Sequence, residues 1–186
     1  MEEIEFIFDA TKESMDSAVD RLRRELQKIS TGKATPMMVD GLLVEYYGSQ
    51  TPISRVANIN VSDARTLVIQ PWEKTMIQPI ERAIFEANLG VTPQNDGEIV
   101  RIIIPPLTND RRKELAKKAK ALGEDAKVSL RNARRDAIKE IKDAVKEGVP
   151  EDVGKDKESE MDDLTKKYSN KCDELVKTKE TDIMTI

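Results

Sequence analysis

Apolar and small residues recur every three or four positions through residues 107–148, and this repeat is the strongest pattern in the chain. Nine of them span 29 residues in eight steps, about 3.6 residues per step, which is the period of a straight α-helix. They are Leu115, Ala119, Leu122, Ala126, Leu130, Ala133, Ala137, Ile141 and Ala144. The pattern predicts one continuous helix, on the order of 55 Å long at about 1.5 Å per residue.

Charges of opposite sign lie on different sides of this predicted helix. When residues are placed about 100° apart around the axis, starting from Leu115, eight cations fall in an arc of roughly 100° to 200°. They are Lys113, Lys117, Lys120, Lys127, Arg131, Arg134, Arg135 and Lys142. Most acidic residues fall on the other flank, and Glu124 is the exception. A solubilising helix face usually mixes its signs at i, i+4, so the sorted arc indicates a binding surface.

Two further amphipathic helices are predicted, one near each end of the sequence. Residues 1–32 carry one apolar stripe, with Gly32 placed to cap the helix end and Pro36 preventing its continuation. After a polar, acidic loop to about residue 158, residues 159–184 carry another. The first stripe consists of Ile4, Phe8, Met15, Val19, Leu22, Leu26 and Ile29. The second consists of Met161, Leu164, Tyr168, Cys172, Leu175 and Ile183.

The helical period disappears between residues 33 and 106, where short β-branched runs alternate with turn residues. Strands are predicted at 42–47, 54–61 and 66–70, followed by a helix at 75–88 capped by Thr75. A hairpin is predicted from 91–94 and 98–104, with its turn at 95–97. We expect Tyr46, Tyr47 and Trp72 to pack inside this small domain, with contact to a partner as the alternative.

These elements predict an α+β fold in which an antiparallel three-helix bundle carries an inserted β/α/β domain. The bundle would comprise residues 1–32 and 107–186, and the insertion residues 33–106. Both connections are short and contain glycine or proline, so a hinge is expected at Gly32, Pro36, Pro105 and Pro106.

Charge and composition limit the kinds of functional site that the chain can contain. The net charge is −4, but residues 107–148 carry thirteen basic and eight acidic side chains, a local balance of +5. The chain has no histidine and one cysteine, which excludes histidine-based triads, disulfides and Cys/His zinc sites. Gly32–Lys33 lacks the flanking residues of a phosphate-binding loop, and Cys172 is expected to be a small buried hydrophobe. We expect no catalytic residue, metal or cofactor.

The helix with the sorted charges suits a nucleic-acid backbone. A row of cations can bind phosphates with release of counterions, and arginine can pair two phosphate oxygens at once. The arc contains no aromatic side chain, which disfavours base stacking and favours the reading of RNA shape. No signal peptide or membrane-spanning stretch is visible, so we expect a cytosolic protein without membrane contact.

Four segments resemble the ribosome recycling factor family, in the family's order and across essentially the whole chain. They read RNARRDA at 131–137, STGKATP at 30–36, VEYYG at 44–48 and IPPLT at 104–108. The resemblance implies an L-shaped molecule similar to a tRNA. It also implies a factor without catalytic activity that acts after termination, with elongation factor G, to separate the ribosomal subunits.

The resemblance also implies where the factor binds. In the family the long bundle lies on large-subunit RNA, and the matching arginines are Arg131, Arg134 and Arg135. We add Lys127, Lys120 and Lys33 as candidate RNA contacts and expect a monomer. Two positions depart from the family, which commonly has arginine at both: Ser30 lacks the charge, and Lys33 keeps it without the bidentate fork.

Two other functions are compatible with the residues alone. A helical chaperone or scaffold could use the basic helix to bind acidic proteins, and the basic face could also be merely solvated. A hydrolase using carboxylates and a divalent ion is the weakest alternative, because no acidic spacing indicates a metal site.

Overall fold

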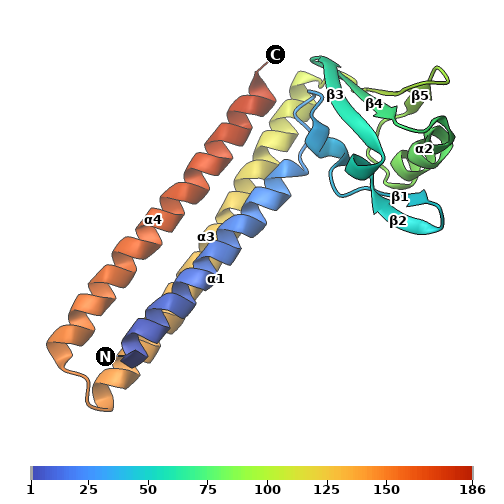
Figure 1. The fold of residues 1–186 in the computed structure, drawn as a ribbon. Helices are drawn as coiled ribbons and strands as arrows, with labels where there is room; N and C mark the ends of the chain where they lie inside the picture. Colours follow the sequence, from blue (N-terminus) through green and yellow to red (C-terminus); the bar gives the residue numbers. More distant parts are fainter. Residues whose placement is uncertain (1, 186) are drawn as a thin grey trace. The chain divides into compact units, whose positions relative to one another are not determined.

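The fold is α+β, with three long helices and a small unit rich in β-strands (Figure 1). The computed structural model describes residues 2–185 and divides the chain into two compact units. The helical unit contains the chain up to Ile29 and from Arg112 onward, and the small unit is Ser30–Arg111. The borders expected from the sequence, after residues 32 and 106, both fall inside the small unit.

The helical unit is an antiparallel three-helix bundle of α1 (Glu2–Gln27), α3 (Asn109–Lys146) and α4 (Glu151–Met184). Figure 1 shows α3 running opposite to α1 and α4, with one short connection between α3 and α4. The predicted helix at 107–148 is confirmed to within two residues at each end, because its period and its capping residues are encoded locally.

The predicted loop before the last helix is wrong, because α4 begins at Glu151 and not near residue 159. Pro150 precedes the first turn, where no backbone N–H is needed, and Glu151 and Asp152 favour the positive end of the helix dipole. Gly154 is buried in that turn, where a Cβ atom would collide with the Val145 side chain of α3. The acidic stretch is therefore a packed helix start.

The buried stripes differ from the predicted ones at a few positions. In α3, Gly123 is buried, whereas Leu122 and Ala133 are only half-buried. A Cβ atom on Gly123 would lie 2.5 Å from Cγ2 of Val176, so this glycine leaves room for the Val176 side chain of α4. In α1, Ile7 and Thr11 are buried while Phe8 is half-buried, and the Thr11 hydroxyl donates to the Ile7 carbonyl.

The small unit has two antiparallel sheets. One pairs β1 (Leu43–Tyr46) with β2 (Ser49–Pro52), and the other has the order β3-β4-β6-β5. The strands of the second sheet are Ala57–Asp63, Thr66–Pro71, Pro93–Asn95 and Val100–Ile103 for β3 to β6. Helix α2 (Ile77–Glu86) buries Ile80 and Ile84 in the same core as Leu67, Ile69 and Ile102.

Three predictions for the small unit need correction. Strand β2 was not expected, because Gly48 and the Thr51–Pro52 pair indicated breaks, yet they belong to a tight hairpin. The expected strand start near Ser54 is a short 3₁₀ helix (Ile53–Arg55), as are Pro36–Val39 (η1) and Lys74–Met76. Thr75 lies inside the last of these and therefore does not cap α2.

The aromatic residues of the small unit are more exposed than expected. Tyr46 is half-buried, but Tyr47 and Trp72 are 81% and 61% exposed. Tyr47 occupies a left-handed position (φ 46°) in the β1–β2 turn, which turns its side chain outward. Its hydroxyl and that of Tyr46 donate to the two oxygens of Glu73, at 2.9 and 3.0 Å. Packing in the core is therefore wrong for Tyr47 and Trp72.

One buried hydroxyl predicts how the helical unit responds to pH. Tyr168 of α4 donates to Oδ1 of Asp16 of α1 at 2.5 Å, and burial, aided by this hydrogen bond, raises the pKa of Tyr168 to about 12. Because the unfolded chain loses this proton near pH 10, the contribution of Tyr168 to stability is fully present below pH 10. It is lost between pH 10 and 12 and amounts to about 3 kcal/mol.

Chemical denaturation at several alkaline pH values measures this loss. Tyr168→Phe is the control, since it lacks the ionisable group and should show a flatter dependence above pH 10. An equally steep decline in Tyr168→Phe would assign the alkaline loss to other groups.

Candidate nucleic-acid interface

Four cations of α3 face α4, and each meets one acidic residue of that helix. We call Lys120, Lys127, Arg134 and Lys142 the seam row. Their partners are Glu180, Asp173, Asp162 and Glu158, respectively. The nitrogen–oxygen distances are 2.5 Å for Arg134 and 3.9 Å for both Lys120 and Lys142. From Lys120 to Lys142 the seam row runs toward the end of α3, and its partners run from Glu180 to Glu158 toward the start of α4. This order is the one expected for antiparallel helices.

Two arginines of the same arc point away from α4. Arg131 and Arg135, which we call the outward pair, have side chains 63% and 74% exposed. Their acidic neighbours are Glu124 and Asp136 of α3, each at 3.8 Å. Ion pairs this exposed contribute about 0–1 kcal/mol, so both guanidinium groups remain available to a phosphate. The same helix also exposes Lys113 and Lys117.

The arc is therefore divided and is not one uniform strip. Lys127, Arg134 and Lys120 lie at its roughly 100–140° edge, whereas the outward pair lies at roughly 160–200°. Lys142, at roughly 180°, is the exception, because it reaches Glu158 near the start of α4 at 3.9 Å. The hydrogen bond to Asp173 raises the pKa of Lys127, and this lysine is only 20% exposed. Arg134 is 40% exposed and uses Nε for Asp162, which leaves its terminal nitrogens for a second acceptor.

The acidic partners on α4 are functional-site residues that the sequence analysis does not identify. A signal was present: Glu158, Asp162, Asp173 and Glu180 are separated by 4, 11 and 7 residues, which places them on one side of a helix. Recognising their role also required the register between α3 and α4, which the sequence does not state.

The remaining candidate residues belong to the small unit. Lys33 is exposed, and Gly32 has a left-handed backbone (φ 74°) whose Cβ position lies 3.1 Å from Cγ of Leu107. The segment that enters the small unit after α1 and the segment that leaves it before α3 are both fixed to the β3–β4 turn. The N–H groups of Ala34 and Ile104 donate to the carbonyls of Ala64 and Arg65, both at 2.8 Å. Pro36 begins the 3₁₀ helix η1 beyond the first of these bonds, whereas Pro105 and Pro106 follow the second.

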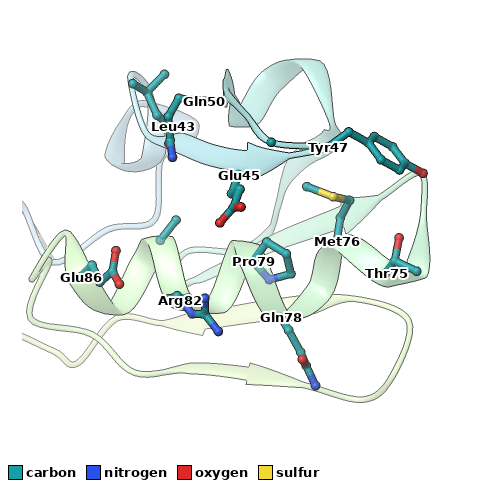
Figure 2. A pocket seen from close by; sticks show the side chains of 12 residues that line it. Leu43, Glu45, Tyr47, Gln50, Thr75, Met76, Gln78, Pro79, Arg82 and Glu86 are labelled. Atoms are coloured by element: carbon teal, nitrogen blue, oxygen red, sulfur yellow. The ribbon is translucent and has the colours of Figure 1, made fainter.

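A hollow of about 530 Å³ lies between the β1–β2 hairpin and α2 (Figure 2). Glu45 extends from β1 toward α2, and Leu43 and Tyr47 lie at the rim of the hollow. The lining mixes apolar, amide and charged groups and presents no nucleophile beside a base. Within residues 2–185, no cluster of three or more potential metal ligands occurs, and no helix is apolar and long enough to cross a membrane.

Comparison with known proteins decides the family. The family model described as "Ribosome recycling factor" matches residues 22–184, which include α3, α4 and the whole small unit. The chain belongs to the ribosome recycling factor family. Members of this family are non-catalytic translation factors that act in ribosome recycling.

Similarity to the ribosome recycling factor family extends over the full chain. The ribosome-recycling factor of Christiangramia forsetii is 50% identical over 186 residues, covering 100% of both chains. That of Bacillus licheniformis is 48% identical over 181 residues, covering 97% of this chain and 98% of its own.

Solved structures agree with this assignment. A solution structure of a ribosome recycling factor matches with a TM-score of 0.87 and 35% identity, covering 100% of both chains. Models of the T. thermophilus ribosome recycling factor and E. coli elongation factor G bound to the E. coli post-termination complex match with a TM-score of 0.67. That match has 35% identity and covers 98% of this chain and 99% of the other.

Proposed function

We propose that this chain binds the post-termination ribosome in the cytoplasm as a monomer and, with elongation factor G, separates the subunits. Family membership over the whole chain supports this role, as does the similarity to a recycling factor described together with elongation factor G on that complex. The sequence contains no nucleotide-binding loop, so the energy for separation has to come from the partner GTPase.

RNA of the large subunit is the proposed ligand of α3. The observation that carries this proposal is the outward pair: two exposed arginines one helical turn apart, held only by acids at 3.8 Å. Their spacing suits successive phosphates of an RNA backbone, and their planar groups can each pair two oxygens. Lys127, Arg134 and Lys120 would extend the contact along the seam row, and Lys33 would add one from the small unit.

Cosedimentation with purified large subunits across a salt series tests the proposal. We expect binding that weakens steeply as salt rises, because cations on α3 displace counterions from RNA. An acidic peptide added as competitor separates this role from that of a scaffold for acidic proteins, since large subunits should outcompete it. Absence of binding at low salt, or binding independent of salt, would contradict the proposal.

We propose that the hinge between the units lies close to Gly32, Pro105 and Pro106. The backbone hydrogen bonds of Ala34 and Ile104 fix the chain to the small unit on one side, and Ile29 and Arg112 belong to the helical unit on the other. Pro36 lies beyond Ala34 within the small unit, so we omit it from the proposed hinge.

Substitution of Gly32 provides a prediction for this segment. Gly32→Ala should destabilise the small unit by about 1–2 kcal/mol, because alanine disfavours φ 74° and its Cβ would crowd Leu107. Gly41→Ala is a matched control: its φ is 79°, but no atom lies within 4 Å of the Cβ position. Thermal unfolding of both variants should show the larger loss for Gly32→Ala, and equal losses would exclude crowding by Leu107.

A further inference from the structure

The acidic partners of the seam row lie at the surface and beside the proposed RNA contact. The side chains of Asp162 and Asp173 are 55% and 57% exposed, and those of Glu158 and Glu180 are 32% and 25% exposed. Oε1 of Glu180 is buried and lies 3.9 Å from Nζ of Lys120, so it is not open to a phosphate. The carboxylates of Asp162 and Asp173 therefore hold the positions that phosphates would occupy beside Arg134 and Lys127.

An exposed ion pair is a weak stabiliser of the fold but an effective competitor for a ligand. Asp162 and Asp173 are more than half exposed, so a phosphate can displace their carboxylates at little cost to the fold. The displaced carboxylate stays on α4, however, and its charge repels the incoming phosphate. The outward pair has no such partner on α4, so the two rows differ in how easily they accept RNA.

We propose that Asp162 and Asp173 of α4 determine specificity by competing with RNA for Arg134 and Lys127 of the seam row. This inference rests on the proposed RNA-binding function of α3. In the free protein these two acids neutralise Arg134 and Lys127, and the outward pair alone offers an arbitrary strand only two arginines. Only an RNA that presents phosphates to both rows at once gains enough contacts to displace the acids.

Folded ribosomal RNA fits this requirement better than a flexible strand. Its phosphates have fixed positions, so no ordering entropy opposes simultaneous contact with both rows. A flexible single strand has to be ordered along α3 and also has to displace the carboxylates. The acids therefore lower the affinity for flexible RNA more than for the intended site, which prevents a +5 helix from binding cellular RNA indiscriminately.

The test neutralises two acids without changing their shape. In Asp162→Asn/Asp173→Asn we expect the affinity for poly(U), measured by fluorescence anisotropy, to rise by about tenfold, since each lost carboxylate removes a nearby repulsion. The affinity for large subunits should rise by less than about threefold, and the dependence of poly(U) binding on salt should steepen by about two phosphate contacts.

A control with the same change in net charge isolates the position of the acids. Asp163→Asn/Glu174→Gln neutralises two exposed acids of α4 that lie outside the seam, Glu174 in a groove toward α1. This variant should leave poly(U) binding close to that of the wild type. Glu158→Gln/Glu180→Gln is a second comparison: because these acids lie 3.9 Å from their lysines and Oε1 of Glu180 is buried, poly(U) affinity should rise less than in Asp162→Asn/Asp173→Asn.

The outcomes separate this inference from the proposed function. If Asp162→Asn/Asp173→Asn binds poly(U) no better than the control, or if its affinity for poly(U) and for large subunits rises by equal factors, the competition model is overturned. That result would leave the RNA-binding role of α3 intact, provided that the wild type still binds large subunits. Failure of the wild type to bind large subunits would instead overturn the proposed function.

Discussion

Replacement of both Arg131 and Arg135 by glutamate should weaken binding to the large ribosomal subunit by about 2–6 kcal/mol, since each lost phosphate contact costs about 1–3 kcal/mol. This corresponds to a decrease of roughly 30-fold to 20,000-fold in affinity, at 1.4 kcal/mol per tenfold. Both side chains are largely exposed and lack strong acidic partners, so little of this loss can come from the fold. Cosedimentation at low salt measures the decrease.

The salt dependence gives a second readout of the same variant. With two phosphate contacts removed, the slope of log affinity against log salt should become shallower by about two. The control is Lys12→Glu/Arg21→Glu on α1, which changes the net charge equally at two exposed positions. A similar loss of binding in both double variants would mean that total charge, and not the outward pair, governs affinity.

Arg134 should respond differently from the outward pair. Its Nε already binds Asp162 at 2.5 Å, and its side chain is only 40% exposed. Part of its charge is therefore neutralised before RNA arrives, and a phosphate gains less from it than from Arg135. The family resemblance treats Arg131, Arg134 and Arg135 alike, and the structure distinguishes them by the helix that each one faces.

The sequence could predict features that are encoded within one element. The 3.6-residue period and the charge sorting of α3 depend on residues four or seven positions apart, so the helix and its basic arc were predictable. The small unit was predictable where Asp96 and Gly97 define a hairpin turn and where β-branched runs define β4 and β6. Tyr47 was mispredicted because a large aromatic residue seldom occupies a left-handed turn position.

Features that depend on two elements could not be predicted in the same way. Which edge of the α3 arc is covered depends on the position of α4, and that position follows from long-range packing. Gly123 and Gly154 illustrate the point: in the sequence each looks like a weak position within a helix, yet each faces a valine of the other helix. These valine contacts lie on the same pair of helices as the seam row and its acids.

The contacts of Gly123 and Gly154 with valines of the other helix predict the second large effect. In the double variant Gly123→Ala/Gly154→Ala, overpacking should cost about 1–3 kcal/mol at each site, and each alanine should return about 1 kcal/mol of helix stability. We expect the cost to lie near its upper limit, because the side chain of a helical valine has one preferred rotamer and cannot turn away. The expected net loss is about 2–4 kcal/mol in the free energy of unfolding, measured by chemical denaturation.

Removal of the valine side chains should reverse this loss. A Cβ atom added to Gly123 would lie 2.5 Å from Cγ2 of Val176, so including Val176→Ala and Val145→Ala relieves both collisions while keeping the helix-forming alanines. A double-mutant cycle on the 123/176 pair should then show a favourable coupling of about 1–3 kcal/mol. If the glycine substitutions alone raise stability by the alanine propensity, α3 and α4 do not approach as closely as the structure shows. In that case the pairing of the seam row with the α4 acids would lose its structural basis as well.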